Sequence, residues 1–254
     1  MVPGGPRLAA HRRRTLARGY LQDGERYDRV RPGYPDDCVD WLVPASAVWA
    51  IDIGAGTGKF TRELVRRSRE VVAVDPSSDM LAVLSRSLPD VRTVEGTAES
   101  TGLPASSAGV VTIAQAWHWC DPVETVAEAA RILAPEGVLA LVWNQLDVSV
   151  PWVHRLSRIM HAGDVFRPSY RPLLGARFTK PESRVFAWTQ LLSASDVVEL
   201  ARSRSYYQNA SVSTRARVDE NLRWYLHEHL GHPWNATLEL PYLTYAWRAT
   251  RSSS

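Results

Sequence analysis

The segment Val48-Trp49-Ala50-Ile51-Asp52-Ile53-Gly54-Ala55-Gly56-Thr57-Gly58 decides the fold that this sequence predicts. Its first six residues are mostly apolar, and three alternating glycines follow at once. A short apolar run bounded by turn residues is typical of a parallel strand that is buried on both faces. We therefore predict a buried strand over 48–53, a sharp turn, and a helix that begins near Lys59 with Thr57 placed to cap it.

The alternation of strand and helix continues on both sides of this segment. Further strands are predicted over 70–75, 91–95, 110–115, 138–143 and 184–189, and helices over 38–42, 76–88, 122–133, 151–160, 195–203 and 214–230. The stretch 238–247, which alternates apolar and polar residues from Tyr242, predicts a last strand, and Pro241 within it indicates a sheet edge because proline cannot donate to a ladder. Repeated βαβ units predict an α/β fold with a doubly wound, mostly parallel seven-stranded sheet.

The composition divides the chain into four parts. Eight arginines and three acidic residues fall within residues 1–31, whereas the whole chain has a formal charge of +3. We expect a flexible basic leader over 1–26, an α/β core over 27–147, a helical cap with the sixth strand over 148–230, and a closing edge strand and tail over 231–254. The charge lies in the leader and not on a basic face with interleaved aromatic residues, which argues against a nucleic-acid partner.

Composition also excludes several classes of protein. The chain has 254 residues, of which 45% are hydrophobic, and this describes a globular protein. It contains no apolar run of the roughly 18 residues that a membrane span requires. Its two cysteines, Cys38 and Cys120, have no metal-ligand spacing and fit a reducing compartment. We expect a cytoplasmic protein without a metal or membrane partner, whose oligomeric state the sequence does not reveal.

The glycine spacing identifies the kind of ligand. In open parallel sheets, ligands bind at the carboxyl ends of the strands. A dinucleotide loop needs a third glycine where Lys59 stands, and a P-loop needs glycine at Ile53 and a hydroxyl residue at Phe60. Asp75 ends the second predicted strand, where a carboxylate accepts hydrogen bonds from both hydroxyls of a ribose. A nucleoside without a diphosphate fits this pattern, and S-adenosylmethionine is such a ligand.

Several segments carry a family resemblance. Ile51-Asp52-Ile53-Gly54-Ala55-Gly56-Thr57-Gly58-Lys59-Phe60-Thr61 and Ala73-Val74-Asp75-Pro76-Ser77 resemble the first and second motifs of class I S-adenosylmethionine-dependent methyltransferases. Glu95-Gly96-Thr97-Ala98-Glu99 and the segment 131–139 are similar to later motifs. Arg31-Pro32-Gly33-Tyr34-Pro35 and Ala114-Gln115-Ala116-Trp117-His118-Trp119 resemble the small-molecule branch that includes trans-aconitate methyltransferase-like proteins. The motifs cover residues 27–145.

The resemblance implies a Rossmann-like methyltransferase fold, a helical cap on the substrate side, and a set of cofactor contacts. The three glycines would line the methionine part, Asp75 would hold the ribose, Met80 would pack near the adenine, and Gln115 would begin the loop nearest the sulfonium. Many relatives have aspartate where this chain has Thr97. The residues that the resemblance assigns to the cofactor are Tyr27, Asp52, Gly54, Ala55, Gly56, Gly58, Asp75, Pro76, Met80, Thr97, Ala98, Glu99 and Gln115.

Three residues keep alternative interpretations. Asp52 either contacts the cofactor or fixes the glycine loop through hydrogen bonds. Arg31 either belongs to the solvated leader or, as a catalytic-site residue that folds over the cofactor with Tyr27, binds a substrate carboxylate. His118, between two tryptophans, is either a catalytic group or part of an aromatic wall.

These residues predict methyl transfer from S-adenosylmethionine to a small molecule by in-line displacement, with a carboxylate or hydroxyl oxygen as the favoured acceptor. A carboxylate is already ionised and needs positioning by arginine or histidine, whereas a hydroxyl benefits from a base, for which His118 is the candidate. The alternative is a catalytically silent cofactor sensor or partner subunit of the same fold. A nicotinamide oxidoreductase is disfavoured by the glycine spacing. The acceptor itself is not encoded in any motif of residues 148–230.

Overall fold

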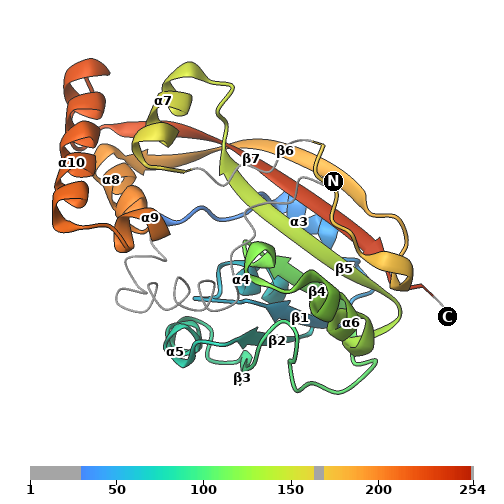
Figure 1. The fold of residues 1–254 in the computed structure, drawn as a ribbon. Coiled ribbons are helices and arrows are strands. Elements are labelled where there is room, and N and C mark those ends of the chain that lie inside the picture. The colour runs from blue at the N-terminus through green and yellow to red at the C-terminus, as the bar shows by residue number, and fades with distance from the viewer. Residues whose placement is uncertain (1–29, 163–168, 253–254) are drawn as a thin grey trace. The chain divides into compact units, whose positions relative to one another are not determined.

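The computed structural model describes residues 30–162 and 169–252 and divides into two compact units (Figure 1). The core unit contains Gly33–Asn144, Pro168–Phe186 and Thr244–Ser254. Among the described residues, the helical unit contains 30–32, 145–162 and 187–243. Each unit is therefore assembled from segments that lie far apart in the sequence.

The core unit confirms the predicted alternation of strands and helices. Its strands β1 to β4 pair in parallel, with β1 between β2 and β4, and β4 pairs in turn with β5. The elements are α3 (Asp36–Leu42), β1 (Trp49–Ile53), α4 (Lys59–Val65), β2 (Glu70–Asp75), α5 (Ser78–Ser87), β3 (Arg92–Glu95), β4 (Ala108–Ala114), η1 (Trp117–Trp119), α6 (Pro122–Ile132), β5 (Leu133–Leu146) and η2 (Gly175–Arg177).

The helix starts follow from local side-chain chemistry. Helix α5 begins after Ser77, whose side chain accepts a hydrogen bond from the backbone N–H of Met80, and α6 begins after Asp121, whose carboxylate accepts two. Helix α4 differs from the prediction, because Gly58 in the left-handed region occupies its N-cap and no side chain caps it. Thr57 is buried and is not the cap.

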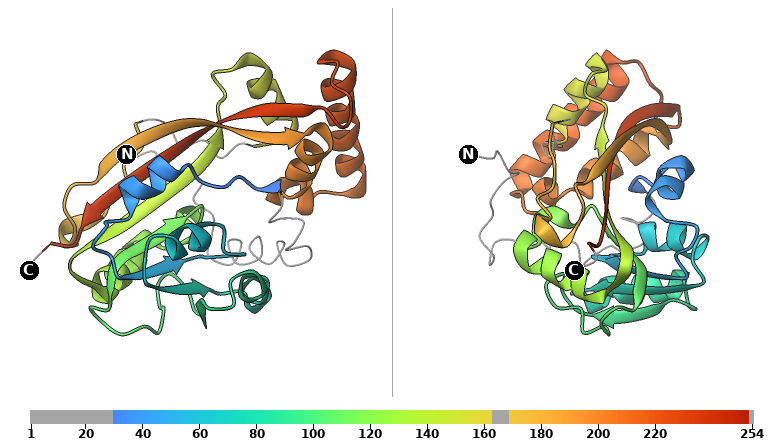
Figure 2. Two further views of the ribbon diagram at one scale, coloured as in Figure 1. Left: turned by 180° about the vertical axis from the view of Figure 1, so that it is seen from behind. Right: turned by 90° about the vertical axis from the view of Figure 1, so that its right-hand side faces the viewer.

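The core unit is closed by helices on both faces of its sheet. Residues of α3 and α4 pack in one apolar cluster with inward-facing residues of the central strands, among them Leu42, Leu64 and Val110. Helix α6 lies on the opposite face, as Figures 1 and 2 show from two sides. Because these layers cover the sheet, only the strand ends and their loops are left for ligand contacts.

The complete sheet has seven strands in the order β3-β2-β1-β4-β5-β7-β6, which confirms the predicted fold class. Strands β6 (Glu182–Ser193) and β7 (Thr237–Thr250) are longer than the sequence indicates. The prediction that the last strand is an edge strand was wrong, since β7 lies between β5 and β6. Pro241 lacks a donor, but its carbonyl accepts a hydrogen bond from the backbone N–H of Asp147. One missing donor is tolerated in a strand of 14 residues.

The helical unit has an apolar core of its own. It contains α7 (Pro151–Ile159), α8 (Ala194–Arg202), α9 (Ser205–Gln208), α10 (Val212–Arg223) and the π-helical turn η3 (Trp224–His229). Leu156, Leu200 and Leu222, from three different helices, are fully buried in one cluster with Tyr225. The helix predicted over 214–230 is thus an α-helix that continues into a π-helical turn at Trp224.

Within residues 30–162 and 169–252, no helix is long and apolar enough to cross a lipid bilayer.

Candidate functional site

The strand order reverses between β1 and β4, and the candidate site lies at the carboxyl ends of these strands. Ile53 is paired with Ile113 in the register of the two strands, so the loops that follow them are neighbours. The backbone N–H groups of Gly54 and Ala55 both donate to the carbonyl of Val74 on the adjacent strand. Such a reversal leaves a crevice between diverging loops, where ligands of open α/β sheets bind.

The structural reason for glycine differs among the three glycine positions of the first loop. All have positive φ angles, of 70°, 55° and 90° for Gly54, Gly56 and Gly58. A Cβ on Gly54 would lie 2.5 Å from the Cβ of Ala116, and one on Gly58 would lie 2.9 Å from the side chain of Leu84. A Cβ on Gly56 would have no atom within 4 Å. The loop is thus packed tightly at its two ends and presents bare backbone to open space at its centre.

Asp75 is held beside this open position by backbone hydrogen bonds. Its Oδ2 accepts from the N–H of Gly56 and its Oδ1 from the N–H of Ser77, both at 2.9 Å. Burial raises the pKa of Asp75, and the two hydrogen bonds lower it by less. Each oxygen of a carboxylate can accept a second hydrogen bond, which leaves one acceptor position on each oxygen for the two hydroxyls of a ribose.

Asp52 is fully buried inside the core unit. Its Oδ2 accepts from the Thr61 hydroxyl at 2.7 Å and its Oδ1 from the Thr112 hydroxyl at 2.8 Å. Burial raises the pKa of Asp52 to about 6. The carboxyl group links β1 to α4 and β4. Because both hydroxyls lie outside the glycine loop, the loop-fixing role and the cofactor contact of Asp52 both stay predictions.

Gln115 follows β4 and has an unusual backbone conformation. Its φ angle is +57°, in the left-handed region that non-glycine residues seldom occupy. Its backbone N–H donates to Val142 and its Nε2 to the carbonyl of Asn144, each at 3.0 Å. Its Oε1 is buried and accepts no hydrogen bond from the described residues. A buried acceptor without a donor fits a ligand that carries an amino group.

The residues assigned to the adenine side lie on the loops after β2 and β3. Met80 and Ala98 are buried, whereas Pro76 and Thr97 are exposed. Glu99 contributes to local structure, because its Oε1 accepts from the N–H of Asp121 at 2.8 Å and ties this loop to the start of α6.

The contacts of the two predicted lid residues with the cofactor stay predictions. Tyr27 lies outside the described residues, so its cofactor contact stays a prediction. Arg31 belongs to the helical unit, where it is half-buried and its Nη2 donates to the carbonyl of Ser203 at 2.8 Å.

His118 lies in η1 between aromatic rings. The centre of its ring is 4.2 Å from that of Trp119 and 4.5 Å from that of Trp143, which it meets edge to face. Its Nδ1 is buried and has no hydrogen-bond partner among the described residues. Burial lowers the pKa of His118 to about 3. The ring is therefore uncharged at neutral pH.

Sequence analysis missed two polar residues near these groups. Asn144 accepts from Gln115 through its backbone carbonyl, donates to the Gly33 carbonyl at 2.8 Å and accepts from the Thr244 hydroxyl at 2.5 Å. The Tyr170 hydroxyl accepts from Nε1 of Trp117 at 3.1 Å. Asn144 directly follows the predicted fifth strand, so the strand-end rule could have found it; no local signal marks Tyr170.

The part of the chain that the structure describes contains no group of three or more histidine, cysteine or acidic side chains that could hold a metal ion.

Comparisons with known proteins show similarity to methyltransferases. Residues 51–141 match a family model described as a methyltransferase domain. The chain is 40% identical to an uncharacterized methyltransferase of Mycobacterium tuberculosis over 94% of this chain and 98% of that protein. It is 36% identical to a malonyl-[acyl-carrier protein] O-methyltransferase of Pectobacterium atrosepticum, over 39% of this chain and 40% of that protein. One similar solved structure comes from Anaeromyxobacter dehalogenans and is described provisionally as a type II methyltransferase. It aligns with a TM-score of 0.60 and 26% identity, over 87% of this chain and 97% of that chain.

The raised pKa of Asp52 generates a prediction about stability. Because the pKa of Asp52 is about 6 in the folded protein against an ordinary value of 3.8, the folded state binds more protons than the unfolded state between these pH values. The free energy of unfolding should therefore fall as the pH rises from about 4 to about 6, by up to about 3 kcal/mol. Asp52→Asn, which keeps hydrogen bonds to both hydroxyls, should lack this fall.

Urea unfolding of the two proteins from pH 4 to pH 8 measures the difference. The stability of the variant relative to the natural protein should grow up to about pH 6 and then stay constant. A difference that is the same at every pH would show that Asp52 does not carry the raised pKa.

Proposed function

This chain belongs to the class I S-adenosylmethionine-dependent methyltransferases, and we propose that its acceptor is a small molecule methylated on an oxygen, with a carboxylate favoured over a hydroxyl. We also propose that it falls in the small-molecule branch that includes trans-aconitate methyltransferase-like proteins. The relative from Pectobacterium atrosepticum, by its name an O-methyltransferase, supports oxygen as the methylated atom.

S-adenosylmethionine is the cofactor, and it supplies a methyl group activated for in-line displacement. We assign its ribose to Asp75, whose two oxygens each keep one acceptor position. Bare backbone at Gly56 leaves room for its methionine part. The unpartnered Oε1 of Gln115 would accept a hydrogen bond from its amino group. The adenine would lie between Met80 and the loop Thr97-Ala98-Glu99.

The observation that carries the choice of acceptor is the environment of His118. A general base works best when its pKa lies near the working pH, and His118 has a pKa of about 3. At neutral pH a hydroxyl acceptor would have to give its proton to a very weak base. A carboxylate is ionised at that pH and needs no base.

We therefore assign His118 a positioning contact with the acceptor and no proton transfer. A neutral imidazole both donates and accepts a hydrogen bond, and Nδ1 has no partner among the described residues. Holding the two reactants in the correct orientation can supply roughly 7–11 kcal/mol of the barrier reduction. Positioning is thus sufficient for an acceptor that is already a nucleophile.

We assign the binding of an acceptor carboxylate to Arg31. Its guanidinium and that of Arg204 both act electrostatically on the hydroxyl of Tyr242, whose pKa burial nevertheless raises to about 12. The Tyr242 hydroxyl is buried and has no hydrogen-bond partner in the described part of the chain. Two cations beside a neutral hydroxyl donor make an environment that suits a carboxylate.

Replacing Asp75 tests the ribose assignment. Asp75→Ala should weaken binding of S-adenosylhomocysteine at least about tenfold, because hydrogen bonds to charged groups contribute about 1.5–3 kcal/mol each. Asp75→Asn, which keeps one acceptor oxygen, should lose less. Isothermal titration calorimetry measures both.

The matched control is Asp79→Ala, which removes an exposed carboxylate four residues later on α5. It should bind S-adenosylhomocysteine like the natural protein. Equal affinities of the Asp75 and Asp79 variants would refute the assignment.

The chemistry of the product tests the acceptor. The purified enzyme, incubated with S-adenosylmethionine carrying a radioactive methyl group and an extract of small metabolites, should form a labelled product that releases volatile methanol in mild alkali. Methyl esters are cleaved under these conditions, whereas methyl ethers and N- or C-methyl groups are not. Label that stays non-volatile after alkali would exclude a carboxylate, and Asp75→Ala serves as the control for transfer that depends on the cofactor site.

Replacing Arg31 tests the carboxylate contact. Arg31→Gln should raise the KM for the labelled acceptor about tenfold or more, since a charge-assisted pair is lost, and should leave the affinity for S-adenosylhomocysteine unchanged. Arg31→Lys should recover part of the loss. Steady-state kinetics measure these KM values. The control is Arg69→Gln, which replaces an exposed arginine of the core unit. An unchanged KM in Arg31→Gln would remove Arg31 from acceptor binding.

A further inference from the structure

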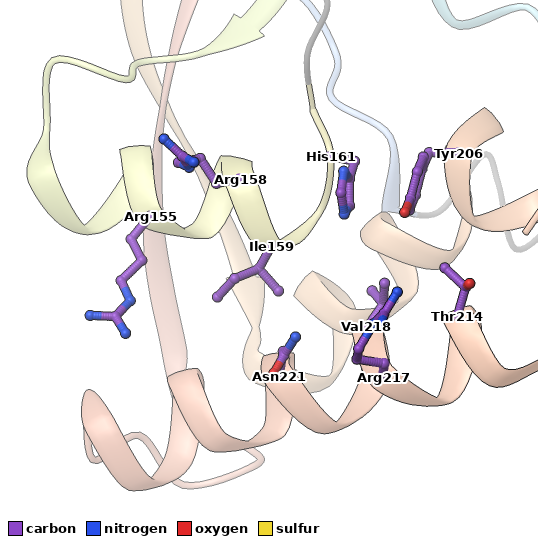
Figure 3. A pocket seen from close by; sticks show the side chains of 9 residues that line it. All are labelled: Arg155, Arg158, Ile159, His161, Tyr206, Thr214, Arg217, Val218 and Asn221. Atoms are coloured by element: carbon purple, nitrogen blue, oxygen red, sulfur yellow. The ribbon is translucent and has the colours of Figure 1, made fainter.

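The helical unit contains a cavity of about 300 Å³ that none of the residues assigned above lines. It lies among α7, α9 and α10, and Figure 3 shows the side chains around it. We call it the arginine pocket. Its lining residues are Arg155, Arg158, Ile159, His161, Tyr206, Thr214, Arg217, Val218 and Asn221.

The two long helices present matching faces to this cavity. Arg155, Arg158 and Ile159 are spaced by three and four residues on α7, and Thr214, Arg217, Val218 and Asn221 follow the same spacing on α10. Residues at such intervals lie on one face of a helix. Val218 is buried and Ile159 is half-buried, so these apolar side chains form the base of the pocket beneath the polar ones. Most of the lining thus comes from two helices, and Tyr206 on α9 and His161 just after α7 complete it.

The pocket has positive charge without compensation. Three arginines line it and no acidic residue does. Among the described residues, Arg158 and Arg217 take part in no ion pair, while the acid beside this face, Asp219, pairs with Arg202 at 2.9 Å. Like charges that share a cavity repel one another and favour an anion between them.

Aromatic rings order other parts of the lining. Arg155 is held with its guanidinium carbon 5.1 Å from the ring centre of Trp224 and 5.4 Å from that of Tyr225. His161 and Tyr206 stack with their ring centres 3.7 Å apart and form a flat wall, seen at the right in Figure 3. Burial and the charge of Arg217 lower the pKa of His161, so the arginines carry the charge of the pocket at neutral pH.

We propose that the arginine pocket binds a small polyanion that carries phosphate or carboxylate groups. Arg158 and Arg217 would donate charge-assisted hydrogen bonds from opposite helices, and Thr214 and Asn221 would add neutral ones. A volume of about 300 Å³ lies at the lower end of the range for small-molecule sites and suits a group of the size of pyrophosphate or citrate. This binding does not depend on the nature of the methyl acceptor.

Calorimetric titration of the full chain tests the proposal. The protein is first saturated with S-adenosylhomocysteine so that the cofactor site is filled. Sodium pyrophosphate and sodium citrate are the two probes, at constant ionic strength. At least one should bind saturably with one site per chain. The double variant Arg158→Gln/Arg217→Gln should weaken that binding at least about tenfold. If only pyrophosphate binds, the ligand is a phosphate, and if only citrate binds, it is a carboxylate.

The matched control is Arg69→Gln/Arg92→Gln, which removes two exposed arginines from the core unit and changes the net charge equally. It should bind the probe like the natural protein. Since the pocket arginines are also exposed, both variants should fold, and their melting temperatures verify this; Arg217→Gln alone provides a milder second variant. In NMR spectra, the ring resonances of His161 should move on titration of the natural protein.

Three results would overturn the proposal. The first is that neither probe saturates the natural protein up to about 10 mM. The second is that the pocket variants bind as the natural protein does. The third is that the control variant loses as much affinity as the pocket variant, which would show that general charge attraction and not the pocket holds the anion.

Discussion

The path of the backbone between Ile53 and Lys59 is the constraint on which the cofactor site depends. Three residues of this loop adopt left-handed φ angles, which would cost about 1–2 kcal/mol each for residues with a Cβ. At Gly54 the neighbouring loop also approaches so closely that no Cβ fits beside Ala116. The same turn brings the Gly56 N–H to Asp75, so one local geometry sets both the open backbone and the position of the acid. Sheet order places this turn where β1 and β4 part, and the ligand site follows from that topology.

The sequence was informative where structure is local and much less so where it depends on distant partners. Strand β2 has the predicted bounds, because an apolar run between polar ends leaves little freedom in an α/β sheet. The position of β7 could not be deduced in the same way. Pro241 shows only that the strand lacks one backbone hydrogen-bond donor. Whether a strand has one neighbour or two depends on the segments beside it. Likewise, nothing local at Trp224 distinguishes an α-helix from the π-helical turn that begins there.

The candidate site likewise contains residues that spacing in the sequence identified and residues that it could not identify. Spacing alone suggested Asp75 and the glycines as site residues. The backbone hydrogen bonds to the Asp75 carboxylate support the choice of Asp75. The conformation of Gln115 could not be predicted, because its left-handed φ is maintained by Val142 and Asn144 on the next strand. Asn144 itself joins Gly33, Gln115 and Thr244, three positions separated by up to 211 residues along the chain. Contacts of this kind exist only after folding and leave no periodic signal.

The two buried acids beside this loop, Asp52 in β1 and Asp75 at the end of β2, differ in their hydrogen-bond partners. Asp52 and Asp75 are both desolvated, and the charge of Asp75 contributes to the raised pKa of Asp52. Asp52 is fully enclosed, and its oxygens already accept from two side-chain hydroxyls. Asp75 accepts from two backbone N–H groups at the rim of the open loop, and those donors stabilise its ionised form. A carboxylate that keeps acceptor positions at the rim of the loop suits hydroxyl donors, whereas the enclosed Asp52, with a pKa of about 6, ties strands and helix together. The two acids, on neighbouring strands, therefore differ in partners and in burial, and this difference supports the proposed binding role for Asp75 alone.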